Sequence, residues 1–271
     1  MTIRKLQPGD EDALENFLAG HPESSMFLRS NLRNSGLDYA DAPYHGDYWS
    51  VFAVDDVIQG VLAHYWNGNI MIQAPDPAEL DGLIQAFRCV AARPIGGVLG
   101  PAEQAGRVIA ALGLSDAGFT KNVDDGLYTL NLSELQRPTG LDSHRDGFVP
   151  ASQIDRPTLT RWIRAYLIEA LGETDNEALT DRTADRVERT IKGTDCWALR
   201  VDGTPVAMSG FNARLPDTVQ IGPVWTPPEH RNKGYARTLL ALTLERAAEG
   251  VKRAILFTDA PAAIRAYEAL G

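Results

Sequence analysis

The chain has 271 residues, enough for one large domain or two ordinary ones, and 44% of them are hydrophobic. This composition excludes a collagen-like chain, a coiled coil and a largely disordered chain. Acidic side chains outnumber basic ones by 36 to 26, and the formal net charge of -10 argues against broad adhesion to nucleic acid or anionic lipid.

The sequence contains no candidate membrane segment. No run approaches 18 apolar residues, and the opening MTIRKLQPGDED turns polar too early for a secretory signal. We therefore expect a cytoplasmic protein. Cys89 and Cys196 each stand alone, so neither a disulfide framework nor a CxxC metal pair is expected.

The first half of the chain alternates between strand and helix patterns. The predicted elements are strand, turn and helix at 3–17, a hairpin at 49–61, a strand and helix at 70–87, and a strand and helix at 98–113. The hairpin is predicted because β-rich runs flank the corner at Asp55-Asp56. This order indicates a mixed α/β fold.

The second half repeats the order more clearly. The predicted strands are 148–151, 197–201, 206–212, 219–225 and 254–258, and the predicted helices are 158–172, 180–192, 234–249 and 262–270. Apolar or small residues follow helical spacing from Ala236 to Ala247, which predicts that one face of that helix packs on a sheet.

The two halves align weakly but in consistent order. Matched positions are Ile3 with Phe148, Trp49 with Trp197, and Arg107 with Arg265. The offset grows along the chain, as insertions in the second copy would require, so we interpret the chain as a duplication. Residues 131–145 are polar and contain Pro and Gly, as is typical of a linker. We predict domains at 1–135 and 148–271 joined by a linker at 136–147.

The segment between the strand at 219–225 and the following helix carries the strongest chemical signal. Arg231 and Lys233 precede Gly234 where the first N–H groups of a helix lack internal partners. Such a site attracts a phosphate or pyrophosphate, because the helix dipole and the cations favour negative charge. A solvated basic turn before an ordinary glycine helix start would have the same composition. The segment matches neither a Walker loop nor a dinucleotide fingerprint.

The sequence RNKGYA at 231–236 resembles the [QR]xxGx[GA] signature of the GNAT superfamily of acyl-CoA-dependent N-acyltransferases. Residues 261–271 are similar to the second hallmark of that family, NPxAxxxYxxxGF. The resemblance covers residues 148–271 and extends to residues 1–130 only through the internal repeat. It implies two tandem GNAT-like domains, the first of them degenerate, because acidic residues follow the strand at 70–75 and Ile109 stands opposite Tyr267.

The resemblance also implies roles for individual residues. Acetyl-CoA would be the co-substrate, with no metal, since the five histidines lack metal-ligand spacing. The residues implied to bind the coenzyme are Val224, Trp225, Thr226, Arg231, Asn232, Lys233, Gly234, Tyr235 and Ala236. Tyr267 would be the general acid, unless it is only a core tyrosine. Glu169 is the candidate base, with a water chain as an equal alternative.

Three features depart from the family pattern. Ala260 replaces the usual Asn before the hallmark proline, and Gln220 stands where many relatives carry a catalytic Glu. The family sheet normally continues past the final GF, whereas this sequence stops at Gly271. We expect an N-acetyltransferase whose acceptor is a small-molecule or protein amine, and a cationic amine would be admitted more readily by an acidic protein. A non-catalytic acyl-CoA-binding or sensing protein is the alternative. Neither nucleic acid nor membrane is expected as a partner.

Overall fold

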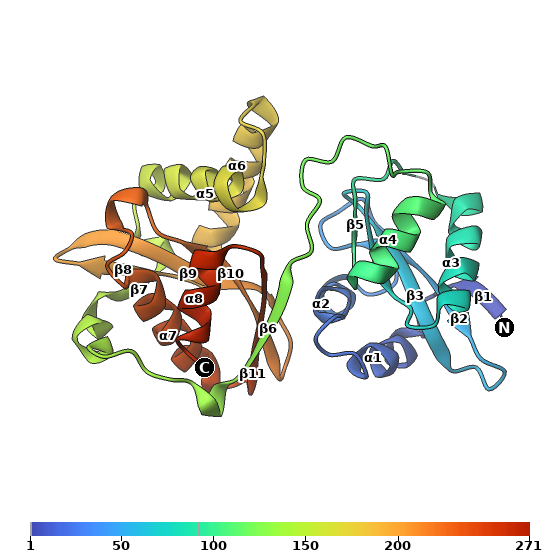
Figure 1. The fold of residues 1–271 in the computed structure, drawn as a ribbon, viewed down its shortest axis with the longest axis horizontal. Coiled ribbons are helices and arrows are strands. Elements are labelled where there is room, and N and C mark those ends of the chain that lie inside the picture. The colour runs from blue at the N-terminus through green and yellow to red at the C-terminus, as the bar shows by residue number, and fades with distance from the viewer. Residues whose placement is uncertain (1, 92) are drawn as a thin grey trace. The chain divides into compact units, whose positions relative to one another are not determined.

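The computed structural model describes residues 2–91 and 93–271, and the chain divides into two compact units between Gly118 and Phe119. Each unit is built on its own sheet, with helices on both faces (Figure 1).

The first unit contains a five-stranded sheet in the order β1-β2-β3-β4-β5. Its elements are β1 (Thr2–Lys5), α1 (Glu11–Ala19), α2 (Met26–Ser35), β2 (Gly46–Phe52), β3 (Ile58–Tyr65), β4 (Asn69–Gln73), α3 (Pro77–Val90), β5 (Gly97–Leu99) and α4 (Ala102–Ala111). The first four strands are antiparallel to their neighbours, and β4 and β5 are parallel. One apolar cluster lies under α1 and α2, and another lies under α3 and α4.

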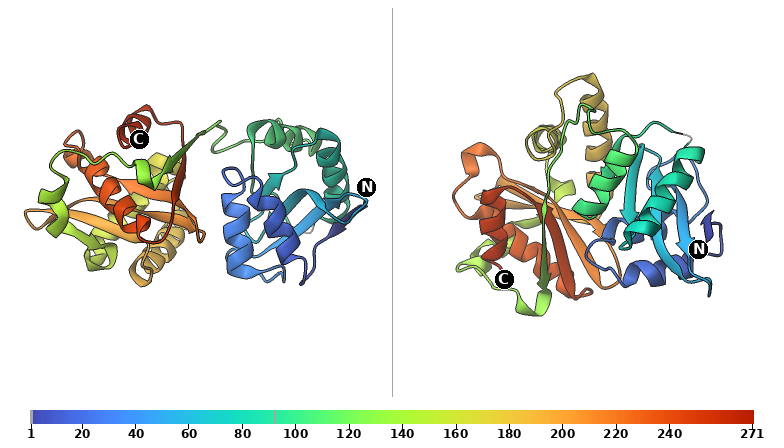
Figure 2. Two further views of the ribbon diagram at one scale, coloured as in Figure 1. Left: turned by 90° about the horizontal axis from the view of Figure 1, so that it is seen from below. Right: turned by 45° about the vertical axis from the view of Figure 1, so that its right-hand side comes forward.

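The second unit contains a six-stranded sheet in the order β6-β11-β10-β9-β8-β7. Its elements are β6 (Gly126–Asn131), β7 (Phe148–Pro150), α5 (Arg156–Leu171), α6 (Glu177–Lys192), β8 (Cys196–Val201), β9 (Thr204–Arg214), β10 (Thr218–Trp225), α7 (Tyr235–Ala248), β11 (Arg253–Thr258) and α8 (Pro261–Glu268). Helices α7 and α8 cover one face of the sheet, and α5 and α6 cover the other (Figures 1 and 2).

The two units share one topology. From β1 to α4 and from β7 to α8, the strands and helices follow the same order, with the same neighbours and the same strand directions. The prediction of a repeated mixed α/β fold is therefore confirmed, as are the predicted strands and helices of the second half, whose bounds agree within a few residues.

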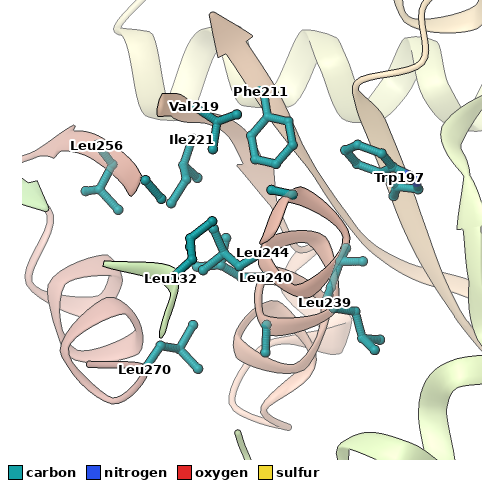
Figure 3. Close-up of a cluster of buried hydrophobic side chains, with 14 of the residues drawn as sticks. Leu132, Trp197, Phe211, Val219, Ile221, Leu239, Leu240, Leu244, Leu256 and Leu270 are labelled. Carbon is teal, nitrogen blue, oxygen red and sulfur yellow. The ribbon is translucent and has the colours of Figure 1, made fainter. Parts of the chain in front are cut away.

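The core of the second unit lies between its sheet and α7. Leu239, Leu240 and Leu244 of α7 pack against Phe211 and Ile221 of the sheet (Figure 3). Eight residues of α7 are buried, because this helix is apolar around most of its circumference and is covered on several sides.

The predicted domain boundary needs correction. Residues 126–131, expected to close the first domain, form β6, which pairs antiparallel with β11 along its whole length. Leu132 and Leu141, expected at the domain end and in the linker, are buried in the core of the second unit. The expectation that 1–135 form one domain is wrong, since the segment from Phe119 onward packs with the carboxyl-terminal unit. Strand β6 also covers the edge that β11 would otherwise expose.

Candidate active site

The site lies where two parallel strands of the second sheet separate. Strand β10 pairs with β11 only from Thr218 to Gln220, yet β10 remains paired with β9 as far as Trp225. Strand β11 likewise remains paired with β6 as far as Thr258. The sheet therefore forks beyond Gln220, and the two arms carry main-chain groups that face no neighbouring strand. Pro223, which cannot donate a main-chain hydrogen bond, lies on one arm of this fork.

Helix α7 begins at the end of the β10 arm with its first turn open. Gly234 is its amino-terminal cap in the left-handed conformation (φ 80°), and no side chain caps the helix. Asn232 is also left-handed (φ 61°), which turns the preceding loop sharply. Among the described residues, no main-chain or side-chain group accepts a hydrogen bond from the N–H groups of residues 234–237. An anion placed there would meet several unpaired donors and the positive end of the helix dipole.

Arg231 does not extend freely toward this turn. Its Nε donates to the Thr226 carbonyl oxygen at 3.0 Å, and its guanidinium contacts the Glu169 carboxylate at 2.8 Å. The guanidinium also lies 5.0 Å from the Trp225 ring centroid. Arg231 therefore fastens the loop before α7 to the end of β10 and to α5. Lys233 folds back to the Glu229 carbonyl oxygen at 3.1 Å.

The two residues predicted for proton transfer have different surroundings. Glu169 is largely exposed and pairs with Arg231, so its carboxylate is already engaged by a cation. Tyr267, on α8, is partly buried and packs against the core. Burial, with a smaller contribution from the nearby Tyr166, raises the pKa of Tyr267 to about 12. Its phenol is therefore protonated throughout the physiological range.

Gln220 occupies the branch point of the fork. The side chain is buried, its Nε2 donates to the Ile221 carbonyl oxygen at 2.7 Å, and its Oε1 has no hydrogen-bond partner among the described residues. Its neighbours Val219 and Ile221 belong to the core under α7, so the Gln220 side chain points toward the opposite face. This amide can accept a hydrogen bond there but cannot accept a proton.

The corresponding place in the first unit is closed. The Asp76 carboxylate accepts hydrogen bonds from the N–H groups of Ala78 and Glu79 at 2.8 and 3.2 Å, so it occupies the donors at the start of α3. The backbone just after β5 also lies close to β4, since a Cβ on Gly100 would come within 3.0 Å of the Ile72 carbonyl oxygen. The sequence signal was present in Asp76, which stands directly before a helix-starting proline.

A small apolar cavity of about 50 Å³ lies elsewhere in the second unit. It is lined by residues of β6, β10, β11, α7 and α8, and Tyr267 is part of its wall. None of residues 224–236 lines it, so this cavity is a packing gap beneath α8 and does not extend to the start of α7.

Residues 157–271 match the family model described as the acetyltransferase (GNAT) family, so the carboxyl-terminal unit contains a GNAT acetyltransferase domain. Comparison with curated protein sequences gives no match.

Solved structures resemble the chain beyond this domain. A tandem GNAT protein from the clavulanic acid biosynthesis pathway is 15% identical, with a TM-score of 0.52, over 100% of this chain and 94% of that one. A GCN5-related N-acetyltransferase from Kribbella flavida is 18% identical, with a TM-score of 0.55, over 91% and 88%. The chain also matches a GCN5-related glucosamine N-acetyltransferase region of a fungal multi-domain beta-N-acetylglucosaminidase at 14% identity and a TM-score of 0.51, spanning 36% of that longer chain. At these identities the likeness shows the fold, which is a tandem GNAT-like arrangement.

Within residues 2–91 and 93–271, no helix is both long and apolar enough to span a bilayer. In the same part of the chain, no group of three or more His, Cys, Asp or Glu side chains could hold a metal ion.

Proposed function

We propose that the protein is an acyl-CoA-dependent N-acetyltransferase whose second unit transfers an acetyl group from acetyl-CoA to an amine by direct attack in a ternary complex. The observation that carries the proposal is the uncapped start of α7 at the open end of the β10–β11 fork. An anion site beside unpaired strand edges suits a ligand with a phosphate-rich end and an extended amide-containing arm.

The residues present fit acetyl-CoA. The donors at 234–237 would hold its pyrophosphate, and Gly234 leaves room, because a Cβ there would meet no atom within 4 Å. Val224, Trp225 and Thr226 lie on the β10 arm or directly after it, where main-chain groups would bind the pantetheine amides and the developing oxyanion. When bound, the co-substrate supplies an activated acetyl thioester.

Tyr267 would donate a proton to the departing sulfur, since its phenol stays neutral at physiological pH. For the amine proton, Glu169 and a water chain remain rival acceptors. The Glu169 carboxylate already forms an ion pair with Arg231, and it would have to leave that contact to reach the amine, which favours the water chain. If Glu169 is the base, the fall in kcat at low pH should disappear in Glu169→Gln. If Glu169 instead positions Arg231, the fall in kcat at low pH should remain in this variant, and its affinity for coenzyme A should decrease.

One observation favours a second candidate function. With Gln220 at the branch point, the fork offers no carboxylate of its own, as in a protein that binds acyl-CoA without turning it over. Incubation with acetyl-CoA and a panel of amines separates the two functions. Sustained release of coenzyme A with acetylated product supports the enzyme. Stoichiometric binding without turnover across small amines and peptide amino termini supports the binding protein.

A further inference from the structure

Arg186 is a cation on the α6 side of the fork whose side-chain hydrogen bond goes to an amide. It is half-buried on α6, and its Nη2 donates to Asn212 Oδ1 at 2.9 Å. Its guanidinium lies 5.4 Å from the centroid of the Tyr166 ring. Within residues 2–91 and 93–271, no carboxylate lies within 4.0 Å of it, whereas Arg164, Arg182 and Arg231 nearby in the fold are each paired with one.

Asn212 places this cation beside the open arm of β10. The Asn212 amide lies against the backbone of Gly222, because a Cβ on that glycine would come within 2.2 Å of Asn212 Nδ2. Gly222 lies two residues after Gln220, which is the last β10 residue paired with β11. Asn212 is exposed and Tyr166 is buried, and both contact the guanidinium of Arg186. The other N–H donors of this guanidinium face solvent.

Tyr166 connects this group to the region of acyl transfer. It packs with Met208 and Trp225 under α5 and α6, on the face opposite α7. Trp225 is the last residue of β10, at the open end of the fork. The cation therefore borders the fork from the α6 side, while the anion site lies at the start of α7.

An oriented, partly desolvated guanidinium with free donors is a good receptor for a carboxylate, which it can bind through two parallel hydrogen bonds. A phosphate would bring a second negative charge that this single cation leaves unbalanced. We propose that Arg186, oriented by Asn212 and Tyr166, binds the carboxylate of the acceptor, so that the acceptor is an amine that also carries a carboxylate. This inference rests on the proposed function and names the substrate class of the same site.

The carboxylate takes no part in the bond changes. The amine nitrogen forms a bond to the acetyl carbon, the carbon–sulfur bond breaks, one amine proton is released and the thiolate receives a proton. Arg186 is thus a specificity-determining residue, and it should act on acceptor binding without affecting coenzyme A.

Matched amine pairs of similar basicity test this assignment. L-phenylalanine is compared with 2-phenylethylamine, and β-alanine with propylamine, at saturating acetyl-CoA. The wild-type protein should prefer the carboxylate-bearing member by about 10- to 100-fold in kcat/KM, the range expected for a charge-assisted hydrogen bond. Arg186→Gln should reduce this preference to about twofold or less and leave the rate with the plain amine unchanged. Arg186→Lys, which keeps the charge but loses the planar fork, should retain part of the preference.

Arg189→Gln is the matched control, because it removes the same charge from an exposed position on the same helix. Calorimetric titration with coenzyme A shows whether each variant is folded and retains its coenzyme site. The proposal is overturned if the plain amines react as well as their partners, if no carboxylate-bearing amine reacts while coenzyme A still binds, or if Arg186→Gln keeps the preference. Failure of the wild-type protein to bind coenzyme A would instead refute the proposed function itself.

Discussion

The Tyr267 hydroxyl can be removed with little change to packing. The ring contacts the core beneath α8 and would remain in place in Tyr267→Phe. If the phenol is the proton donor, kcat should fall by about 10²-fold, near the lower end of the range for general acids, because water can replace it in part. KM for acetyl-CoA should change less, as for an interaction made mainly when charge develops on sulfur.

Steady-state kinetics of Tyr267→Phe measures this loss, and Tyr128→Phe serves as the comparison. Tyr128 is a phenol of edge strand β6 that lines the same small cavity as Tyr267. If Tyr267 only fills the core, its variant should keep a rate within about twofold of the parent per folded molecule. That result would remove Tyr267 from the mechanism.

Two partly buried acids should make the second unit sensitive to alkali. Burial raises the pKa of the Cys196 thiol from 9.0 to about 12, as it raises that of Tyr267 from 10.0 to about 12. The unfolded chain releases these protons earlier than the folded one, so the stabilisation is complete below pH 9 and is lost as pH rises from 9 toward 12. Each group should contribute a slope of roughly 1.4 kcal/mol per pH unit within its own window.

Urea unfolding between pH 8 and 11 tests this dependence. Cys196→Ala should flatten the alkaline fall in unfolding free energy, whatever it does to stability at neutral pH. Cys89→Ala is the matched control, because it removes an exposed thiol of the first unit. Equal slopes in both variants would show that the Cys196 thiol titrates normally in the folded protein.

At the scale of elements, a substitution at the start of α7 is the most direct test of the proposed coenzyme site. Gly234→Asp should abolish coenzyme A binding, since it places a negative charge at the open donors. Gly203→Asp is the matched control, because Gly203 has nearly the same backbone conformation (φ 78°, against 80° at Gly234) and equally free surroundings, but lies in the β8–β9 turn. The two variants therefore share the backbone strain and differ only in location.

Calorimetry should give one coenzyme A site per parent chain, one for Gly203→Asp and none for Gly234→Asp. A second, equivalent site in the parent would contradict the closed start of α3, where Asp76 already occupies the donors. Unchanged affinity in Gly234→Asp would place the phosphate groups elsewhere.

Local sequence signals predicted most of these elements. Helical spacing predicted a helix at 234–249, observed as α7 at Tyr235–Ala248. Strand β6 was missed because its residues alternate between exposed and half-exposed and its partner is distant in sequence. Contacts such as Arg231 with Glu169 were equally hidden, since residues from α5 and the α7 loop meet only in the folded unit.

At the scale of the whole molecule, the second unit should depend on residues that precede its predicted start. A fragment of residues 119–271 should fold and bind coenzyme A with the affinity of the full chain. A fragment of residues 148–271 should be unstable, because it lacks β6, Leu132 and Leu141. Loss of the two buried leucines alone costs about 3–6 kcal/mol, a large part of ordinary domain stability.

Thermal unfolding followed by circular dichroism compares the two fragments. A cooperative transition in 119–271 that is absent or much lower in 148–271 supports the revised boundary. Equal stability would show that β6 is dispensable and would return the boundary to the position predicted from sequence composition.

The placement of β6 also bears on the order in which the protein folds. Asn131 of β6 pairs with Arg253 of β11. Strand β6 is the first strand of the second sheet to leave the ribosome and β11 is the last, so β6 cannot pair until the other strands have been synthesised. Closing so long a loop carries a high entropic cost and slows folding. The first unit, whose strands all pair with sequence neighbours, can complete its sheet during synthesis, while β6 remains a free edge until translation has passed β11.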